Sequence, residues 1–218
     1  MKTTIDVLAQ APELAEKAVV NARGLVPAKD ADLVLRRGLG DTAALRAARE
    51  FQQAKASEWA FLVLSGPPGV GKTTALGWLG LQTAAVLGPK PGPRNLSDYH
   101  CSDGPRTIYF RESVAWARAT ELARVGLYDR EAIKPYLQRP ILILDDLGLE
   151  FRDAKGAFDA LIGEVLDHRY AERRRTAIST NLTAREFTER YGERIVDRLR
   201  ECGRFVTCTG PSMRGVAR

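Results

Sequence analysis

The sequence predicts a three-layer α/β domain built on a five-stranded, mainly parallel sheet. Five short runs of apolar and β-branched residues alternate with segments of helical period. The predicted strands are residues 59–65, 106–112, 140–146, 175–180 and 204–210. Strands that are apolar on both faces and alternate with helices are typical of a parallel sheet with helices on both sides. A chain of 218 residues is long enough for one such domain with a short appendage.

The N-terminal part of the chain carries no recognisable chemistry. Residues 1–23 show only a weak helical pattern. Further on, Asp41 or Thr42 can cap a helix with one apolar face. That face consists of Leu45, Ala48 and Phe51. We therefore expect a short helical N-terminal extension over residues 1–58 and the α/β core over residues 59–218.

The later connections of the predicted core differ in character. Residues 87–105 are rich in Pro and Gly, which indicates a loop between the first core helix and the second strand. Residues 154–172 show the clearest helical period in the chain. Its apolar face consists of Phe158, Leu161, Ile162, Val165 and Leu166.

Charge and composition narrow the class of protein. The net charge is +6, and ten arginines oppose six acidic residues between positions 169 and 204. A basic excess suits a polyanionic partner such as nucleic acid. Three cysteines without C-x-x-C spacing and two histidines argue against a disulfide framework or a zinc site. The sequence offers no membrane span and no signal peptide, so we expect a cytoplasmic protein.

Residues 66–73, GPPGVGKT, match the phosphate-binding Walker A motif G-x-x-x-x-G-K-[ST]. The glycines allow backbone N–H groups to turn toward a phosphate, and the following helix adds its positive end. Lys72 would reach the β- and γ-phosphates of a nucleotide, and the hydroxyl of Thr73 would bind Mg²⁺. The predicted nucleotide-binding residues are Gly66, Pro67, Pro68, Gly69, Val70, Gly71, Lys72, Thr73 and Thr74.

The strand at residues 140–146 ends in two acids, as a Walker B strand does. Carboxylates at the end of a buried parallel strand emerge at the carboxyl edge of the sheet, where α/β proteins bind ligands. Asp145 would hold Mg²⁺ through water, and Asp146 would orient or activate the attacking water. Together the two motifs predict an enzyme that uses ATP and Mg²⁺.

In these motifs the chain resembles the AAA+ ATPases, and among them the DnaC/IstB type of helicase loaders and transposition helpers. Five segments carry the resemblance in the order of that family. They are GPPGVGKT (66–73), LILDDLG (142–148), HRYAERRRTAISTNLT (168–183), YGERIVDRL (191–199) and GPSMR (210–214). The resemblance implies a P-loop NTPase fold with little or no C-terminal helical lid, because the chain ends four residues after Arg214.

The resemblance also assigns roles to individual residues. Asn181 matches sensor 1, which would contact the γ-phosphate or the attacking water, with Thr180 as the alternative. Arg198, or Arg194 one turn earlier, matches the arginine finger that completes a neighbouring subunit's ATP site. Arg214 matches sensor 2.

Each of these assignments has an ordinary structural alternative. Residues 179–181 could cap a helix. Arg198 could form exposed ion pairs with Glu193 and Asp197. Arg214 could belong to a frayed tail. The basic run at residues 172–175 could bind a phosphate backbone or could be a solvated helix end.

The resulting prediction is an AAA+ ATPase that self-associates and loads or remodels a replicative helicase on single-stranded DNA. An IstB-like helper of a transposase is the runner-up. An ATP-binding scaffold with very slow turnover and a small-molecule kinase are the readings from other classes. Asp146 stands where most AAA+ enzymes have Glu, and its shorter side chain favours slow hydrolysis, stimulated by a partner or by DNA.

Overall fold

The computed structural model describes residues 40–86, 114–120, 122, 129, 131–150 and 156–213. Several expectations fall outside these described residues. They concern the weak helix at 1–23, the loop at 87–105, the strand at 106–112 and Arg214.

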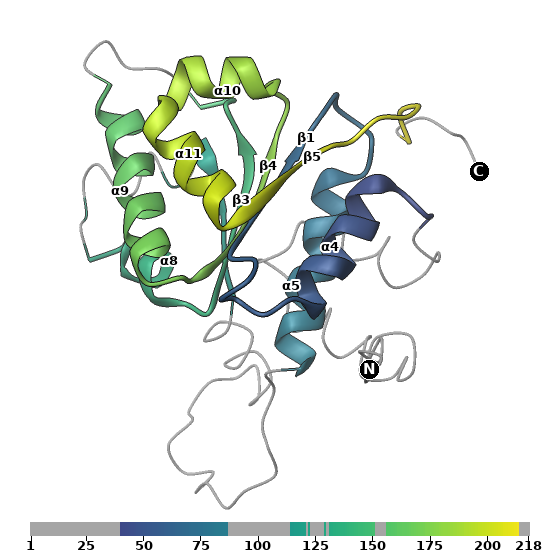
Figure 1. Ribbon diagram of the computed structural model, residues 1–218, viewed down its shortest axis with the longest axis horizontal. Coiled ribbons are helices and arrows are strands. Elements are labelled where there is room, and N and C mark those ends of the chain that lie inside the picture. The colour runs from purple at the N-terminus through teal and green to yellow at the C-terminus, as the bar shows by residue number, and fades with distance from the viewer. Residues whose placement is uncertain are drawn as a thin grey trace, which may run out of the picture.

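The core is a five-stranded parallel sheet in the order β2-β3-β4-β1-β5 (Figure 1). Its strands are β1 Phe61–Ser65, β2 Val114–Arg118, β3 Ile141–Leu147, β4 Arg175–Thr180 and β5 Gly203–Thr207. All four strand pairs are parallel. Strand β1 leads into the predicted phosphate loop and β3 carries the acid pair. The two strands therefore flank β4, and the carboxyl ends of all three lie at one edge of the sheet.

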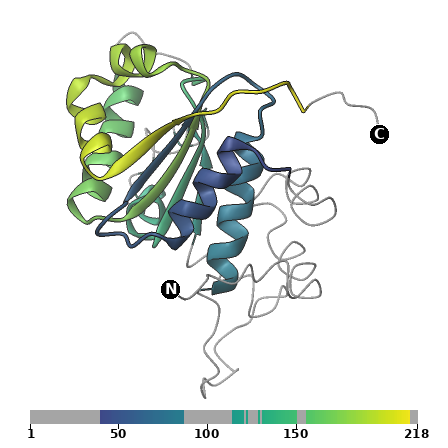
Figure 2. The same cartoon turned by 45° about the vertical axis from the view of Figure 1, so that its right-hand side comes forward.

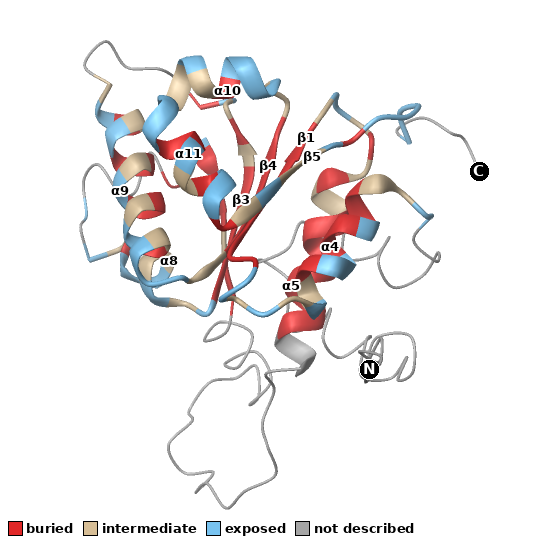
Figure 3. Ribbon diagram, viewed as in Figure 1, coloured by how far each residue is buried: buried red, intermediate tan, exposed pale blue. Residues whose placement is uncertain are grey.

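Helices cover both faces of the sheet, as predicted (Figure 2). The helices are α4 Ala43–Gln53, α5 Lys72–Val86, α8 Lys134–Gln138, α9 Ala157–Ala171, α10 Ala184–Tyr191 and α11 Glu193–Glu201. Helices α4 and α5 pack on one face, and α9, α10 and α11 pack on the other. Buried side chains fill both interfaces, and the outer surfaces of α10 and α11 are exposed (Figure 3).

Helix α4 shares the hydrophobic core of the sheet. Its N-cap is Thr42, whose hydroxyl accepts a hydrogen bond from the N–H of Leu45 at 3.1 Å. The predicted apolar face, including Ala48 and Phe51, is fully buried and packs with β1, β3 and α5. An N-cap of this kind satisfies a backbone donor that the helix leaves unpaired.

Four of the observed strands agree with the sequence expectation within a few residues. The strand beside β3 is β2 at Val114–Arg118, a segment for which no strand was expected. Strand β5 ends at Thr207 rather than at residue 210. The N–H of Cys208 still donates to the carbonyl of Ser65, and the chain then follows the loop after β1.

Candidate active site

The loop between β1 and α5 has the backbone of a phosphate-binding turn. Gly66, Gly69 and Gly71 have φ angles of 150°, 89° and 90°, which residues with a β-carbon rarely adopt. The loop leads directly into the N-terminus of α5, where unpaired N–H groups and the helix dipole favour an anion. The strand–loop–helix context that the motif requires is thus present.

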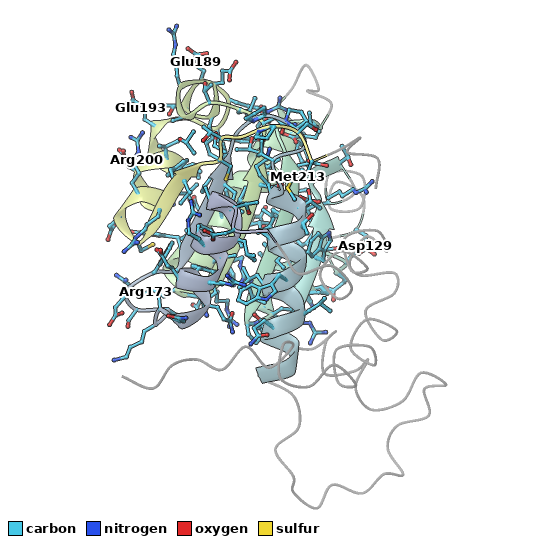
Figure 4. The ribbon with its side chains drawn as sticks, turned by 90° about the vertical axis from the view of Figure 1, so that its right-hand side faces the viewer. Asp129, Arg173, Glu189, Glu193, Arg200 and Met213 are labelled. Carbon is cyan, nitrogen blue, oxygen red and sulfur yellow. The ribbon has the colours of Figure 1, made fainter. Side chains whose placement is uncertain are left out.

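The C-terminal segment 208–213 lies against this loop. The N–H of Met213 donates to the carbonyl of Gly69 at 2.9 Å. A β-carbon on Gly69 would lie only 2.2 Å from the hydroxyl of Ser212, so the close approach itself requires glycine. Met213, labelled in Figure 4, is the last residue that the structure describes. Arg214 follows directly but lies outside the described residues.

A small pocket opens beside the loop, between α4, the start of α5 and the C-terminal segment. Its wall is largely apolar, and the side chain of Met213 forms part of it while remaining about half exposed. The lining residues are Gly40, Thr42, Leu45, Gly71, Thr74, Ala75 and Met213. In this conformation the pocket has room for little more than a water molecule.

Lys72 is buried, and its amine joins the loop to β4. Its Nζ donates to the carbonyls of Gly66 and Pro67 at 2.6 and 2.8 Å. The same Nζ donates to Oδ1 of Asn181 at 2.9 Å. Lys72 follows β1 and Asn181 follows β4, so the loop lysine and the predicted sensor residue meet at the carboxyl edge of the sheet.

Thr73 and Asp145 are also in contact. The hydroxyl of Thr73 donates to Oδ1 of Asp145 at 3.0 Å, and the hydroxyl of Ser179 donates to the same oxygen at 2.6 Å. Asp145 is almost completely buried, whereas the neighbouring Asp146 is partly exposed. Ser179 was not expected at the site, because sequence reasoning singled out only the two residues after it.

The other residues at the end of β4 and just after it have separate roles. The hydroxyl of Thr180 is buried and donates to the carbonyl of Leu147 at 2.6 Å, which ties the ends of β4 and β3 together. The helix-cap alternative for residues 179–181 is wrong, because the N-cap of α10 is Thr183. Thr183 forms a capping box with Glu186, and its hydrogen bonds lower the pKa of that carboxyl.

Both candidate arginine fingers are held on α9. Arg194 and Arg198 lie on the same face of α11, and each donates to one carboxylate oxygen of Asp167. The side chain of Arg194 is 70% exposed and that of Arg198 is 32% exposed. Arg198 also lies over the ring of Tyr170, 5.2 Å from its centroid. In place of the alternative ion pairs with Glu193 and Asp197, the described contacts of Arg198 include an ion pair with Asp167 on a different helix.

A buried acid, Glu150, anchors the segment that follows β3. The side chain of Glu150 is fully buried and accepts hydrogen bonds from the N–H of Gly148 at 2.7 Å and from the hydroxyl of Tyr191 at 2.5 Å. Arg190 forms an ion pair with it at 2.7 Å. Burial and the charge of Glu150 raise the pKa of Tyr191 well above its ordinary value. This network joins the end of β3 to the end of α10.

The arginines of the basic run at residues 172–175 make contacts with other segments of the fold. Arg173, Arg174 and Arg175 each donate to a backbone carbonyl of another segment. Arg175 also lies 4.1 Å from the ring centroid of Phe51, and burial lowers its pKa to about 10. The run precedes β4, at the edge of the sheet away from the phosphate loop, and Figure 4 shows Arg173 far from Met213. These contacts favour a structural role over a nucleic-acid contact.

A metal held by protein side chains alone is not a feature of the described part of the chain. None of its His, Cys, Asp and Glu side chains gather in threes that could hold an ion. Mg²⁺ instead prefers one or two protein oxygens together with phosphates and waters, which Thr73 and Asp145 could provide. Over the same residues, no helix has both the length and the apolar character that crossing a bilayer requires.

Three solved structures place this fold among known proteins. The DnaC helicase loader is 23% identical with a TM-score of 0.56, over 76% of this chain and 88% of that chain. DnaI is 22% identical with a TM-score of 0.55, over 83% of this chain and 89% of that chain. The replication initiator DnaA bound to AMPPCP and single-stranded DNA is 17% identical with a TM-score of 0.58, over 79% of this chain and 48% of that chain.

These similarities confirm the predicted fold and, at the level of the fold, the resemblance to the DnaC type of AAA+ ATPase. Neither a protein-family model nor a curated protein matches the sequence. At these identities the structures establish the architecture alone. Function has to be argued from the site.

Proposed function

We propose that the protein is an AAA+ ATPase of DNA replication that binds ATP with Mg²⁺ and loads or remodels a replicative helicase on single-stranded DNA. One observation carries the ATPase part of this proposal. Two hydrogen-bonded pairs of side chains, Lys72 with Asn181 and Thr73 with Asp145, bring the start of α5 together with β3 and the end of β4 at one edge of the sheet. The fold shared with DnaC, DnaI and DnaA supports the link to replication.

We propose a task for each of these side chains. Lys72 would exchange its carbonyl partners for the β- and γ-phosphates of ATP, and the glycine turn would supply backbone N–H groups. Asn181 touches Lys72, and this contact supports a role for its amide at the γ-phosphate or the attacking water. Asp146, partly exposed beside buried Asp145, would orient that water. The base would lie beside Gly71, where the small apolar pocket would have to widen to hold it.

The donor set suits Mg²⁺. The Thr73 hydroxyl directs its hydrogen toward Asp145, so its oxygen can act as a ligand, and Asp145 can bind water on the ion. Bound there with ATP, the ion would neutralise charge that develops on the phosphates. A hard cation with few protein ligands agrees with the oxygen-only character of these groups.

The proposal includes a shared active site between subunits. Arg194 and Arg198 lie on α11, and the described contacts place them on Asp167 rather than at the phosphate loop of their own chain. Either guanidinium would have to leave the partly buried carboxylate of Asp167 to reach a neighbour's phosphate, a planar, bidentate match that could replace the lost ion pair. Arg198 is our first choice for the trans-acting group, and Arg194 is the more exposed alternative.

Hydrolysis assays at several protein concentrations test this proposal. ATP turnover per subunit should rise with concentration, and single-stranded DNA should stimulate it. Lys72→Ala and Arg198→Ala should each be inactive, and a mixture of the two should regain activity because one supplies the arginine and the other the loop. Arg185→Ala, which alters an exposed ion pair on α10, is the matched control.

The outcomes separate the alternatives. A rate per subunit that is independent of concentration, with no recovery in the mixture, would reject the shared site. ATP binding without measurable turnover under any condition would favour the passive scaffold. A transposase as the binding partner in place of a helicase would favour the IstB-like helper role, which shares the same core.

A further inference from the structure

Strand β3 contains a bulge at its two acids. Its register with β4 pairs Leu144 with Ile178 and then Leu147 with Thr180. Two residues of β3, Asp145 and Asp146, therefore oppose the single residue of β4 between these pairs. This two-against-one arrangement is a β-bulge, a feature that bends a strand and often re-aims side chains beside active sites.

The bulge places Asp146 in an uncommon backbone conformation. Its φ is 59°, in the left-handed region that aspartate tolerates better than most residues with a β-carbon. A bulge also removes a backbone group from the regular ladder, so the N–H of Asp146 needs another partner. The conformation persists only if that partner is supplied.

Ser179, the residue of β4 opposite the bulge, supplies this partner. Its hydroxyl accepts a hydrogen bond from the N–H of Asp146 at 2.9 Å and donates to Oδ1 of Asp145 at 2.6 Å. Ser179 is completely buried. One hydroxyl therefore replaces a missing ladder bond and fixes the carboxylate that also contacts Thr73.

We infer that Ser179 is a positioning residue that sets both acids of the site at once. It holds the Asp145 carboxylate beside Thr73, and it holds the Asp146 backbone in the turn that brings its side chain out of the sheet. An alanine at this position would leave a backbone donor and a carboxylate oxygen each without this partner. The inference rests on the proposed function, since it assigns Asp145 to Mg²⁺ and Asp146 to the attacking water.

The test compares Ser179→Ala with Thr176→Val. Both remove a completely buried hydroxyl from β4, but that of Thr176 contacts Arg169 and Arg174 near the start of the strand, away from the acids. The measured quantities are ATP binding, kcat and the Mg²⁺ concentration that gives half-maximal binding of Mg²⁺. All are measured below the unfolding temperatures of both variants. Thr176→Val reports what a loss of stability alone does to these quantities.

We expect Ser179→Ala to affect turnover or Mg²⁺ binding but not the binding of ATP alone. Ser179→Ala should lower kcat or Mg²⁺ affinity by about 10- to 100-fold, as for other groups that orient metal ligands. Its affinity for ATP without Mg²⁺ should stay within about twofold of wild type, because the phosphate loop is untouched. Thr176→Val should keep wild-type kcat and Mg²⁺ dependence.

Each other outcome overturns a defined part of the account. If Ser179→Ala matches wild type, or changes no more than Thr176→Val, the positioning role is rejected while the proposed function stands. If the wild-type protein binds ATP with Mg²⁺ but does not turn it over, Mg²⁺ affinity still decides the role of Ser179. If the wild-type protein does not bind ATP with Mg²⁺, both the proposed function and this inference are rejected.

Discussion

Lys72 and Asn181 are 109 positions apart in the chain, and the lysine amine donates to the asparagine carbonyl oxygen at 2.9 Å. The contact joins the phosphate loop after β1 to the end of β4. It places an amide beside the cation that would hold the γ-phosphate of ATP, which is the arrangement a γ-phosphate sensor needs.

Asn181→Ala should lower kcat about 100-fold while changing ATP affinity by no more than a few-fold. An amide that contacts the γ-phosphate or the water contributes mainly in the transition state, and the loss of one such group costs about this much. Steady-state kinetics and equilibrium binding of ATP measure the two effects. An equal loss of ATP affinity and of kcat/KM would show a binding role instead.

Asn181→Asp should act differently from the alanine variant. A carboxylate at this position would form an ion pair with Lys72 and repel the phosphates, so ATP affinity should fall at least about tenfold. Titration with ATP at low and high salt checks the prediction, because screening should partly restore affinity. Tighter binding than in wild type would contradict the placement of Asn181 beside the phosphate site.

Glu150→Gln should lower the free energy of unfolding by about 3 kcal/mol, since removing one partner of a buried ion pair leaves the other uncompensated. The fully buried carboxylate also accepts hydrogen bonds from Gly148 and Tyr191, so several contacts weaken together. Chemical denaturation gives the value. The exposed ion pair of Arg185 and Glu189 is the control, and its loss should cost less than about 1 kcal/mol.

The fall in the free energy of unfolding at acidic pH should depend in part on the capping box of α10. The hydrogen bonds from Thr183 lower the pKa of Glu186 in the folded protein, so this carboxylate stabilises the fold at pH values above its unfolded pKa. That contribution is lost as the pH falls through the folded pKa. The stability difference between wild type and Glu186→Gln should therefore be largest near neutral pH and shrink below about pH 4. A constant difference across this range would contradict the assignment.

The sequence predicted the layers of the fold because its strongest patterns are local. The apolar strands at β1, β3 and β4 and the period of α9 need no distant contact to be recognised, and each lies within a few residues of its prediction. Strand β2 was not predicted, because its sequence VAWAR is rich in alanine and its pairing with β3 decides its conformation.

The parts of the site that sequence reasoning missed depend on register and long-range packing. Ser179 could be identified only once β3 and β4 were aligned, because the bulge decides which residue opposes the two acids. Glu150 resembles any polar residue after a strand until Arg190 and Tyr191 are seen around it. The basic run before β4 resembles a nucleic-acid patch until its arginines are found on backbone carbonyls.

ATP binding and hydrolysis by the wild-type protein and by Lys72→Ala, with Mg²⁺ present, test the central claim most directly. The account predicts that the wild-type protein binds and hydrolyses ATP, and that the variant loses at least about 100-fold in turnover while keeping its fold, because no other group replaces the ammonium on the γ-phosphate. An Arg185→Ala control should behave as wild type. A Lys72→Ala protein that binds and hydrolyses ATP as well as wild type would contradict the account.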